Sequence, residues 1–350
     1  MDKIVMLKDF YRNKKVLITG HSGFKGSWLA LTLFGLGAEL YGLSDMSVES
    51  GIYKVLKKNK IFKNEYINDI TDEDFVKKTL INQNYEIVFH FAAQGLVSKA
   101  SEDPKNTILT NVLGTYNVLN ATNLNKNIEN LIIATTDKVY EEHNAQNTEN
   151  FKLGGKEFYS ASKASSEHII SAFNNTSKRS DLNVGVVRAG NVLGGGDYGK
   201  DRILTDVINS IKSNQNILLR NPKSIRPWQY VLDSIFGYLL VGEYCNENKK
   251  SDIFNLNSTT NNKVTVKEFV DKLIECWSLS EKIEIQIDQN NLLYESEVLT
   301  IDSTKAKNIL GWQPNKEISD ICEHIVAYEK NDNKFNWAVN HINEFIDSYY

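Results

Sequence analysis

Hydrophobic and polar positions follow two alternating patterns along the first part of the chain. Short apolar runs are separated by stretches in which apolar side chains recur at the three- and four-residue spacing of a helix. The runs predict strands at residues 15–19, 38–44, 66–70, 86–94, 131–140 and 184–188, and the helical spacing predicts helices at 28–36, 72–80 and 104–123. Strands that alternate with helices are typical of a parallel sheet covered on both faces. The pattern therefore predicts an α/β fold built on a doubly wound, Rossmann-type sheet.

The rest of the chain predicts a smaller C-terminal α/β lobe. A strand at 253–257 is expected to return to the large sheet, and further elements are expected at 265–276, 283–287, 302–310, 318–328 and 342–349. We predict a Rossmann domain over residues 1–190, with a returning segment near 227–258, and a mainly substrate-binding lobe over 191–350. The polar segment 141–156 is predicted to be a mobile loop near the site.

Three glycines interrupt the pattern directly after the first strand. Gly20, Gly23 and Gly26 lie between an apolar strand and an amphipathic helix. Glycine lets the chain reverse without Cβ clashes, and it lets a pyrophosphate approach backbone N–H groups at the positive end of a helix. This placement predicts a dinucleotide site. The second strand ends at Ser44 and Asp45 without an arginine to meet a 2′-phosphate, so NAD is favoured over NADP, although the choice stays open.

Polar or small residues gather where later strands end. Ala92 and Ala93 close the fourth strand, and residues 135–138 (Thr-Thr-Asp-Lys) close the fifth. In an open α/β sheet, ligands collect at this edge. Tyr159 and Lys163 are one helical turn apart, so the ammonium is expected to lie beside the phenol and to lower its pKa.

Several other positions carry two interpretations. Asn111 interrupts an apolar helical pattern and is either functional or solvent-facing. The pair Asp69–Ile70 either lies beside the adenine of the dinucleotide or contains an ordinary aspartate that caps the next helix. Arg202 and Arg226 are candidate anion partners, because arginine offers a bidentate fork. Trp228 either stacks on a base or packs under the sheet edge.

Composition narrows the class of protein. The chain has 350 residues and a formal net charge of −4 with interspersed signs, which favours neither nucleic acid nor a membrane surface as a partner. It has no apolar run of membrane length and a polar N-terminus, so we expect it in the cytoplasm. Its three cysteines and six histidines show no ligand spacing, so no metal site is expected.

Together these features resemble the extended short-chain dehydrogenase/reductase superfamily, and within it the CDP-glucose 4,6-dehydratase family. The resemblance covers nearly the whole chain, from about residue 9 to about residue 328. The segments that carry it are 20–28, 136–140, 153–155, 188–197, 201–202 and 225–229. Its most specific element is the pair Asp137–Lys138, because related dehydratases usually have Asp-Glu there and C4 epimerases have no such pair.

The resemblance implies bound NAD, a nucleotide-sugar substrate and a homo-oligomer, either dimer or tetramer, that serves deoxysugar synthesis for O-antigen or capsule polysaccharide. Tyr159, held by Lys163 and Thr136, would take the 4-hydroxyl proton. Neutral Lys138 would remove the C5 proton, and protonated Asp137 would give its proton to the departing 6-hydroxyl. The expected dinucleotide contacts are Gly20, His21, Gly23, Phe24, Lys25, Gly26, Asp69, Ile70, Ala92, Ala93, Gln94, Asn111, Thr135, Tyr159 and Lys163. The expected substrate contacts are Thr136, Asn191, Arg202, Arg226 and Tyr230.

Some positions depart from the family pattern and keep alternatives open. The departures are Gly95, Ser98, Ala100, Thr205, Tyr230 and residues 294–296. They leave the five expected catalytic residues intact, so the chemistry is better defined than the identity of the sugar and base. A dehydratase of another nucleotide sugar and a C4 epimerase stay as alternatives. A non-catalytic NAD-binding sensor would be expected to have lost Tyr159 or Lys163.

Overall fold

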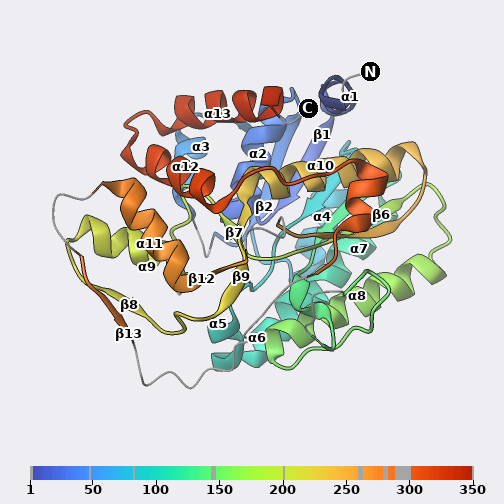
Figure 1. The fold of residues 1–350 in the computed structure, drawn as a ribbon. Coiled ribbons are helices and arrows are strands. Elements are labelled where there is room, and N and C mark those ends of the chain that lie inside the picture. Colours follow the sequence, from blue (N-terminus) through green and yellow to red (C-terminus); the bar gives the residue numbers. More distant parts are fainter. Residues whose placement is uncertain are drawn as a thin grey trace.

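A seven-stranded parallel sheet forms the centre of the computed structural model, which describes residues 3–46, 49–81, 83–142, 147–199, 202–258, 263–278, 283–287 and 301–348 (Figure 1). Its strand order is β11-β6-β5-β4-β1-β2-β3, and every neighbouring pair is parallel. The strands are β1 (Lys15–Thr19), β2 (Glu39–Ser44), β3 (Phe62–Ile67), β4 (Ile87–His90), β5 (Asn130–Ala134), β6 (Asn183–Ala189) and β11 (Asp252–Leu256). The predicted fold class is confirmed, and the strand predicted at 253–257 does return to this sheet.

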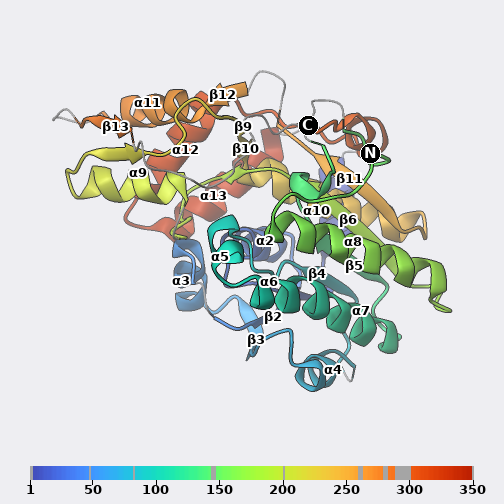
Figure 2. The ribbon, with the colours of Figure 1, turned by 90° about the horizontal axis from the view of Figure 1, so that it is seen from below.

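Helices cover both faces of the sheet, as the alternation of strands and helices predicts. One face packs on α1 (Lys3–Tyr11), α2 (Phe24–Gly35) and α10 (Val231–Glu247), and the other packs on α4 (Glu73–Ile81), α7 (Gly114–Leu124) and α8 (Phe158–Thr176) (Figure 2). Side chains of a strand point alternately to the two faces. In β1, Val16 and Ile18 join one core cluster while Leu17 joins the other. Both faces of the central strands are therefore buried.

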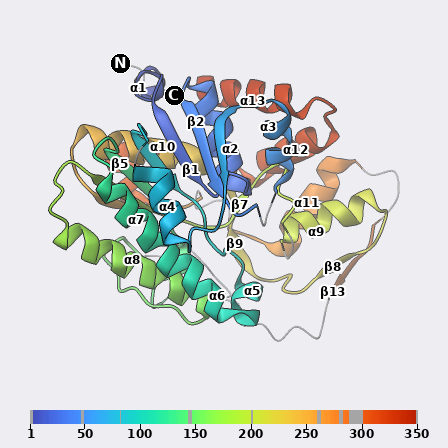
Figure 3. The ribbon, with the colours of Figure 1, turned by 180° about the vertical axis from the view of Figure 1, so that it is seen from behind.

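The smaller lobe lies on one side of the molecule, away from α7 and α8 (Figure 3). It contains α9 (Ile203–Lys212), β8 (Ile217–Leu219), β9 (Ile225–Pro227), β12 (Lys263–Thr265), α11 (Val266–Trp277) and β13 (Ile285–Ile287). β9 pairs with β12 and β8 pairs with β13, while β7 (Val192–Leu193) pairs with β10 (Gln229–Tyr230). The last helices, α12 (Ile318–Lys330) and α13 (Lys334–Ser348), join the main core cluster. The predicted domain boundaries themselves stay a prediction.

Several predicted elements differ from the structure. The fourth strand, predicted over 86–94, is limited to Ile87–His90. The third strand occupies Phe62–Ile67 instead of 66–70; it is an edge strand whose half-exposed positions weaken the apolar pattern. The strand predicted over 131–140 ends at Ala134, and Asp137–Val139 form a 3-10 turn. The helix predicted over 104–123 is α6 (Pro104–Ile108), a π turn (Leu109–Leu113) and α7.

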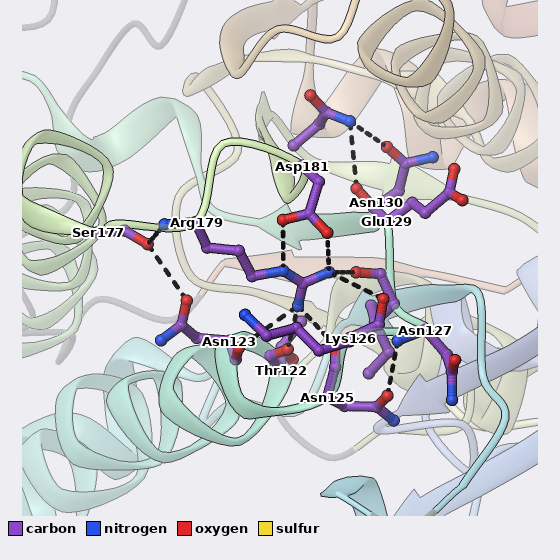
Figure 4. A network of polar contacts seen from close by, with 12 residues as sticks. Thr122, Asn123, Asn125, Lys126, Asn127, Glu129, Asn130, Ser177, Arg179 and Asp181 are labelled. Atoms are coloured by element: carbon purple, nitrogen blue, oxygen red, sulfur yellow. Dashed lines mark hydrogen bonds and ion pairs between the residues drawn. The ribbon is translucent and has the colours of Figure 1, made fainter.

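A buried arginine ties the connections at the amino end of the sheet (Figure 4). The Arg179 guanidinium donates to the carbonyls of Thr122 and Asn125 at the end of α7, and to that of Ile128 before β5. Its Nε also bonds the exposed carboxylate of Asp181 at 2.9 Å. Helix ends leave carbonyl groups without partners inside the helix, and this side chain satisfies them. Arg179 therefore fixes α7, α8 and β6 relative to one another.

Some predicted positions lie outside the described residues. They are Asp201, residues 143–146 of the predicted loop and residues 294–296. Among the residues that are described, no helix is both long and apolar enough to span a membrane, and no group of three or more histidine, cysteine or acidic side chains is arranged to hold a metal ion.

Candidate active site

The glycine turn lies at the carboxyl end of β1, between β2 and β4. Gly20 has a φ of 73°, and a Cβ at this position would lie 2.6 Å from the backbone nitrogen of Ala92. A Cβ at Gly26 would collide with the carbonyl of Gly20. Both positions therefore require glycine because backbone packs directly on backbone.

The start of α2 fits the diphosphate of a dinucleotide. Gly23 is the N-cap of α2 and supplies no side-chain hydrogen bond to the first turn. A Cβ built on Gly23 would meet only the carbonyl oxygen of Gly20, at 3.3 Å, so its outer face is open. Uncapped N–H groups at the positive end of a helix, next to an open glycine, are the donor set that a pyrophosphate takes. The crevice between β1 and β4 is also where the strand order reverses.

Asn111 and Gln94 form a clasp at the end of β4. Asn111 accepts from the backbone N–H of Gln94 at 2.8 Å, and its amide donates to the Gln94 carbonyl and to the Ser162 hydroxyl. The Gln94 side chain bonds Leu96 and Thr107. Asn111 is 1% exposed, so the solvent-facing interpretation is wrong. Its position in a π turn directs the side chain to β4 and α8 at once.

Thr136, Tyr159 and Lys163 come together at the end of β5. A capping box at Glu157 starts α8, which places Tyr159 in the first turn and Lys163 one turn later. The phenol hydrogen-bonds with Thr136, and that bond lowers its pKa. The Lys163 ammonium donates to the Ala134 carbonyl at 3.2 Å.

The electrostatics of this trio differ from the expectation. Burial raises the pKa of Tyr159 to about 12, against the lowering that we expect from Lys163. Burial also lowers the pKa of Lys163 to about 8. At a given pH, a smaller fraction of Lys163 is therefore protonated than of an exposed lysine. Desolvation therefore outweighs the helical Tyr/Lys spacing in the protein alone.

Asp137 and Lys138 follow in the 3-10 turn. The Thr136 hydroxyl donates to the Asp137 carboxylate at 3.0 Å, and it also accepts from the backbone N–H of Lys138. Asp137 is 2% exposed, and a Cβ at Gly190 would lie 2.9 Å from its Oδ2. Thr136 thus links the phenol to the acid, and Lys138, in the same turn, is half-buried. A phenol and a carboxyl group held together in this way can accept and donate protons.

Thr135 faces a different partner. Its hydroxyl donates to the Glu167 carboxylate at 2.7 Å, and Glu167 is paired with Arg188. Both members of that ion pair have side chains 2% exposed. The Arg188 guanidinium also donates a hydrogen bond to the hydroxyl of Tyr140. The hydroxyl of Thr135 therefore joins the end of β5 to α8.

Sequence reasoning missed Tyr238, which lies on α10 under the site. Its hydroxyl is 3.4 Å from the Lys25 Nζ, and its ring packs on Phe91 with centroids 4.6 Å apart. Tyr238 also interacts electrostatically with Tyr159. The signal in the sequence is weak: Tyr238 is a ring with a polar hydroxyl in the otherwise apolar middle of α10.

The two predicted anion partners, Arg202 and Arg226, lie in different surroundings. Arg202 bonds Asp197 at 2.9 Å and lies close enough to Tyr159 and Lys25 to affect both of their pKa values. Arg226 is buried on β9, opposite Val264. Trp228 packs against Phe269, with ring centroids 4.8 Å apart, which fits the packing interpretation. The backbone of Asn191 joins this region by accepting from Gln229.

Some expected contacts point elsewhere. The Tyr230 ring packs among α12 and α13, and its hydroxyl meets His341 at 2.5 Å, so it is not brought to Thr136. His21 bonds Glu65 on β3, and the ring of Phe24 packs on the backbone of the loop after β7. Asp69 accepts from the N–H of Thr71, which fits a local turn, and Ile70 packs on Gly114. The roles of these four residues at the dinucleotide stay predictions.

Comparison with known proteins defines the family. The sequence model of the GDP-mannose 4,6 dehydratase family matches residues 17–325. CDP-glucose 4,6-dehydratase of Salmonella typhimurium is 35% identical over 334 residues, which cover 92% of each chain. The chain belongs to the nucleotide-sugar 4,6-dehydratase family. The predicted family and enzyme class, a hydro-lyase, are confirmed.

Epimerases are more distant relatives of this 4,6-dehydratase. UDP-glucose 4-epimerase of Lactobacillus helveticus is 24% identical over 87% of this chain and 94% of its own. The crystal structure of UDP-glucuronic acid 4-epimerase from Bacillus cereus, in complex with UDP-glucuronic acid and NAD, aligns with a TM-score of 0.78 at 20% identity, over 93% of this chain and 99% of that one. That structural likeness confirms the fold. The sequence identity to the Salmonella dehydratase is higher than that to either epimerase, so the epimerase alternative fits less well.

Proposed function

We propose that the chain converts CDP-glucose to CDP-4-keto-6-deoxyglucose and water, with NAD as a resident cofactor, as a step in deoxysugar synthesis for O-antigen or capsule polysaccharide. One observation carries the proposal: the Asp137–Lys138 pair is joined through Thr136 to the Tyr159 phenol. A C4 epimerase needs the phenol but has no elimination to catalyse. The 35% identity to a dehydratase that acts on CDP-glucose supports the choice of substrate.

The residues that would hold the dinucleotide are the glycine turn and the first turn of α2 for the diphosphate, and the strand ends at Ala92–Ala93 and Thr136 for the nicotinamide side. The bound nicotinamide supplies the acceptor for the hydride that leaves C4, the donor of the hydride that returns to C6, and a positive charge that favours the ionised phenol. It is therefore not consumed overall.

The side chains of the chain move the protons. Tyr159, hydrogen-bonded to Thr136 and followed by Lys163, takes the proton of the 4-hydroxyl as C4 becomes a ketone. The ketone acidifies the C5 hydrogen, and Lys138 removes it. Asp137 gives a proton to the 6-hydroxyl, which leaves as water. A proton returns to C5 when C6 is reduced, so the atoms of glucose and of the product balance with one water released.

A panel of CDP-, dTDP-, UDP- and GDP-linked hexoses tests the substrate and the reaction together. We expect the alkali-induced absorbance of a 4-keto-6-deoxy product from CDP-glucose and little from the others. Activity confined to another base would identify a different 4,6-dehydratase, which the departures near Ser98 and Tyr230 keep as the second candidate. Interconversion of C4 epimers without loss of water would overturn the dehydratase proposal.

Isotope transfer tests the mechanism. Deuterium placed at C4 of the substrate is expected to reappear at C6 of the product, because the same ring of the cofactor holds it in between. Deuterium lost to the solvent, or retained at C4, would contradict the proposed hydride path.

A further inference from the structure

Glu329 is a buried carboxylate on α12 that the proton transfers do not use. Its side chain is fully buried, and its Oε2 lies 2.5 Å from the Lys212 Nζ. It accepts from the backbone N–H of Gly196 at 3.3 Å, and the Tyr198 hydroxyl lies 3.1 and 3.0 Å from its two oxygens. A buried carboxylate is costly unless it is paired and hydrogen-bonded, so these contacts hold one another in place.

The partners of Glu329 lie before α9 and at its far end. The first two belong to the loop of residues 194–199, after β7, and Lys212 is the last residue of α9. Tyr328, which precedes Glu329 on α12, packs against the same loop, because a Cβ at Gly195 would lie 2.3 Å from its ring. α12 therefore fixes the 194–199 loop and the far end of α9 together.

The same loop sets the position of Arg202, the N-cap of α9. Asp197 is buried in the loop and bonds the Arg202 guanidinium at 2.9 Å, while its backbone carbonyl accepts from the Thr205 hydroxyl at 2.8 Å. A Cβ at Gly199 would lie 3.0 Å from the Arg202 Nε, so the loop backbone lies against this side chain. Arg202 is near enough to Tyr159 to lower the pKa of the phenol. The loop thus holds a guanidinium beside the site.

We propose that Glu329 is a positioning residue, which acts through the 194–199 loop and Asp197 to hold Arg202 where it binds the diphosphate of the nucleotide sugar. This inference rests on the proposed function. The Arg202 side chain is 40% exposed, so without an anchor it would adopt many rotamers, and binding would have to order it. A guanidinium held in one orientation can meet a phosphate with both arms of its fork.

Binding of the nucleotide sugar to the NAD-loaded chain tests this inference. The KM of CDP-glucose, and the dissociation constant of CDP by calorimetry, are measured for wild type, Glu329→Leu and Glu329→Gln. We expect Glu329→Leu to raise both constants by about tenfold or more, with kcat within about threefold of wild type at a pH above the ascending limb. Glu329→Gln keeps an acceptor for the loop and is expected to restore most of the affinity.

Tyr198→Phe tests the same link with little change of shape. It removes the hydroxyl that bonds Glu329, and we expect it to raise the dissociation constant of CDP by about threefold or more. Arg202→Met should raise this constant as well. If Glu329 and Tyr198 act through Arg202, adding Tyr198→Phe or Glu329→Leu to Arg202→Met has no further effect.

The pH profile gives a readout that a purely structural role would not move. Because Arg202 lowers the pKa of Tyr159, its displacement in Glu329→Leu is expected to move the ascending limb of kcat/KM to higher pH. Glu323→Gln, at an exposed position of α12, and Arg179→Ala, which removes a distant buried cation, are the controls and should move neither the limb nor the KM.

Two outcomes would overturn the role of Glu329. One is an unchanged affinity for CDP in Glu329→Leu and Tyr198→Phe, and the other is a full additional loss when either is combined with Arg202→Met. If Glu329→Leu does not fold, Tyr198→Phe alone decides both points. Failure of the wild-type chain to bind CDP at all would instead overturn the proposed function.

Discussion

Thr135 and Thr136 are consecutive threonines whose hydroxyls serve different partners. Thr135 donates to the buried Glu167, whereas Thr136 contacts Tyr159 and Asp137. A threonine-to-valine change removes each hydroxyl at almost constant shape. The pair therefore separates a hydrogen bond of the site from one of the scaffold.

The first prediction concerns the pH dependence of Thr136→Val. Thr136 has one hydroxyl proton, and turning it from the Asp137 carboxylate to the ionised phenol stabilises that phenolate and lowers the pKa of Tyr159. Without it that pKa rises, and less phenolate is present at any lower pH. We expect the ascending limb of kcat/KM against pH to move upward by about one pH unit.

Thr135→Val is the matched control. We expect it to lower the free energy of unfolding by about 1–2 kcal/mol, because the Glu167 carboxylate loses a donor, without moving the ascending limb. Equal shifts of the limb in both variants would show that the effect of Thr136 is not specific to the phenol.

The second prediction assigns the proton transfer at C5. In Lys138→Met the base is removed while the phenol and the glycine turn are intact. We expect substrate-dependent reduction of the bound dinucleotide to persist, and exchange of the C5 hydrogen with solvent to fall by about a hundredfold or more. Lys156→Met, at an exposed lysine before α8, serves as the control. Unchanged turnover in Lys138→Met would remove Lys138 from its proposed role.

At the scale of elements, a buried ion pair joins the strands that carry the site to α8. Arg188 on β6 makes three hydrogen bonds to the carboxylate of Glu167 on α8, which in turn accepts from Thr135 at the end of β5. Removing one partner of a buried pair leaves an uncompensated charge in a poorly solvated place. The pair therefore fixes the position of the segment that begins with Thr136.

The third prediction follows from this pair. We expect Arg188→Met to lower the free energy of unfolding by about 3–5 kcal/mol in urea titration, and a double change with Glu167→Leu to recover part of that loss. Lys267→Met breaks an exposed helical ion pair with Asp271 and is expected to cost at most about 0.5 kcal/mol. A cost below about 1 kcal/mol for Arg188→Met would contradict a stabilising role.

At the scale of the whole molecule, the two ends of the sheet have separate tasks. The carboxyl ends of the strands carry the predicted catalytic residues, whereas the amino ends are tied together by Arg179. Sites that share no contacts contribute almost additively. Stability and catalysis can therefore be perturbed independently.

The fourth prediction uses this separation. Arg179→Ala leaves several helix-end carbonyls without a donor, and we expect it to lower the free energy of unfolding by about 3 kcal/mol or more. The kcat of the folded fraction is expected to stay within about twofold of wild type. Asp181→Asn removes only the exposed partner, 59% accessible, and is expected to change stability by less than about 1 kcal/mol. A large loss of kcat in folded Arg179→Ala would show that the two ends are coupled.

The oligomeric state belongs to this scale as well, and the expected dimer or tetramer stays a prediction. So do the domain boundaries and the roles of the individual site residues.

Local sequence patterns were enough to predict the succession of strands and helices along the chain, the glycine turn, and the helix that carries Tyr159 and Lys163. These features follow from local rules, because apolar periodicity sets which backbone is buried and glycine sets where a chain can turn tightly. The dehydratase family also followed from the sequence, through the pair Asp137–Lys138 beside Thr136.

The directions in which the side chains of those segments point depend on the folded arrangement of the whole chain. It placed Tyr230 against α13, turned Thr135 toward Glu167, and set Asn111 in a clasp with Gln94. It also brought Tyr238 beneath Lys25, across 213 positions of sequence. The physical reason is that burial and hydrogen bonding depend on residues far apart in the chain, and those contacts set both the pKa values and the partners that local spacing leaves open.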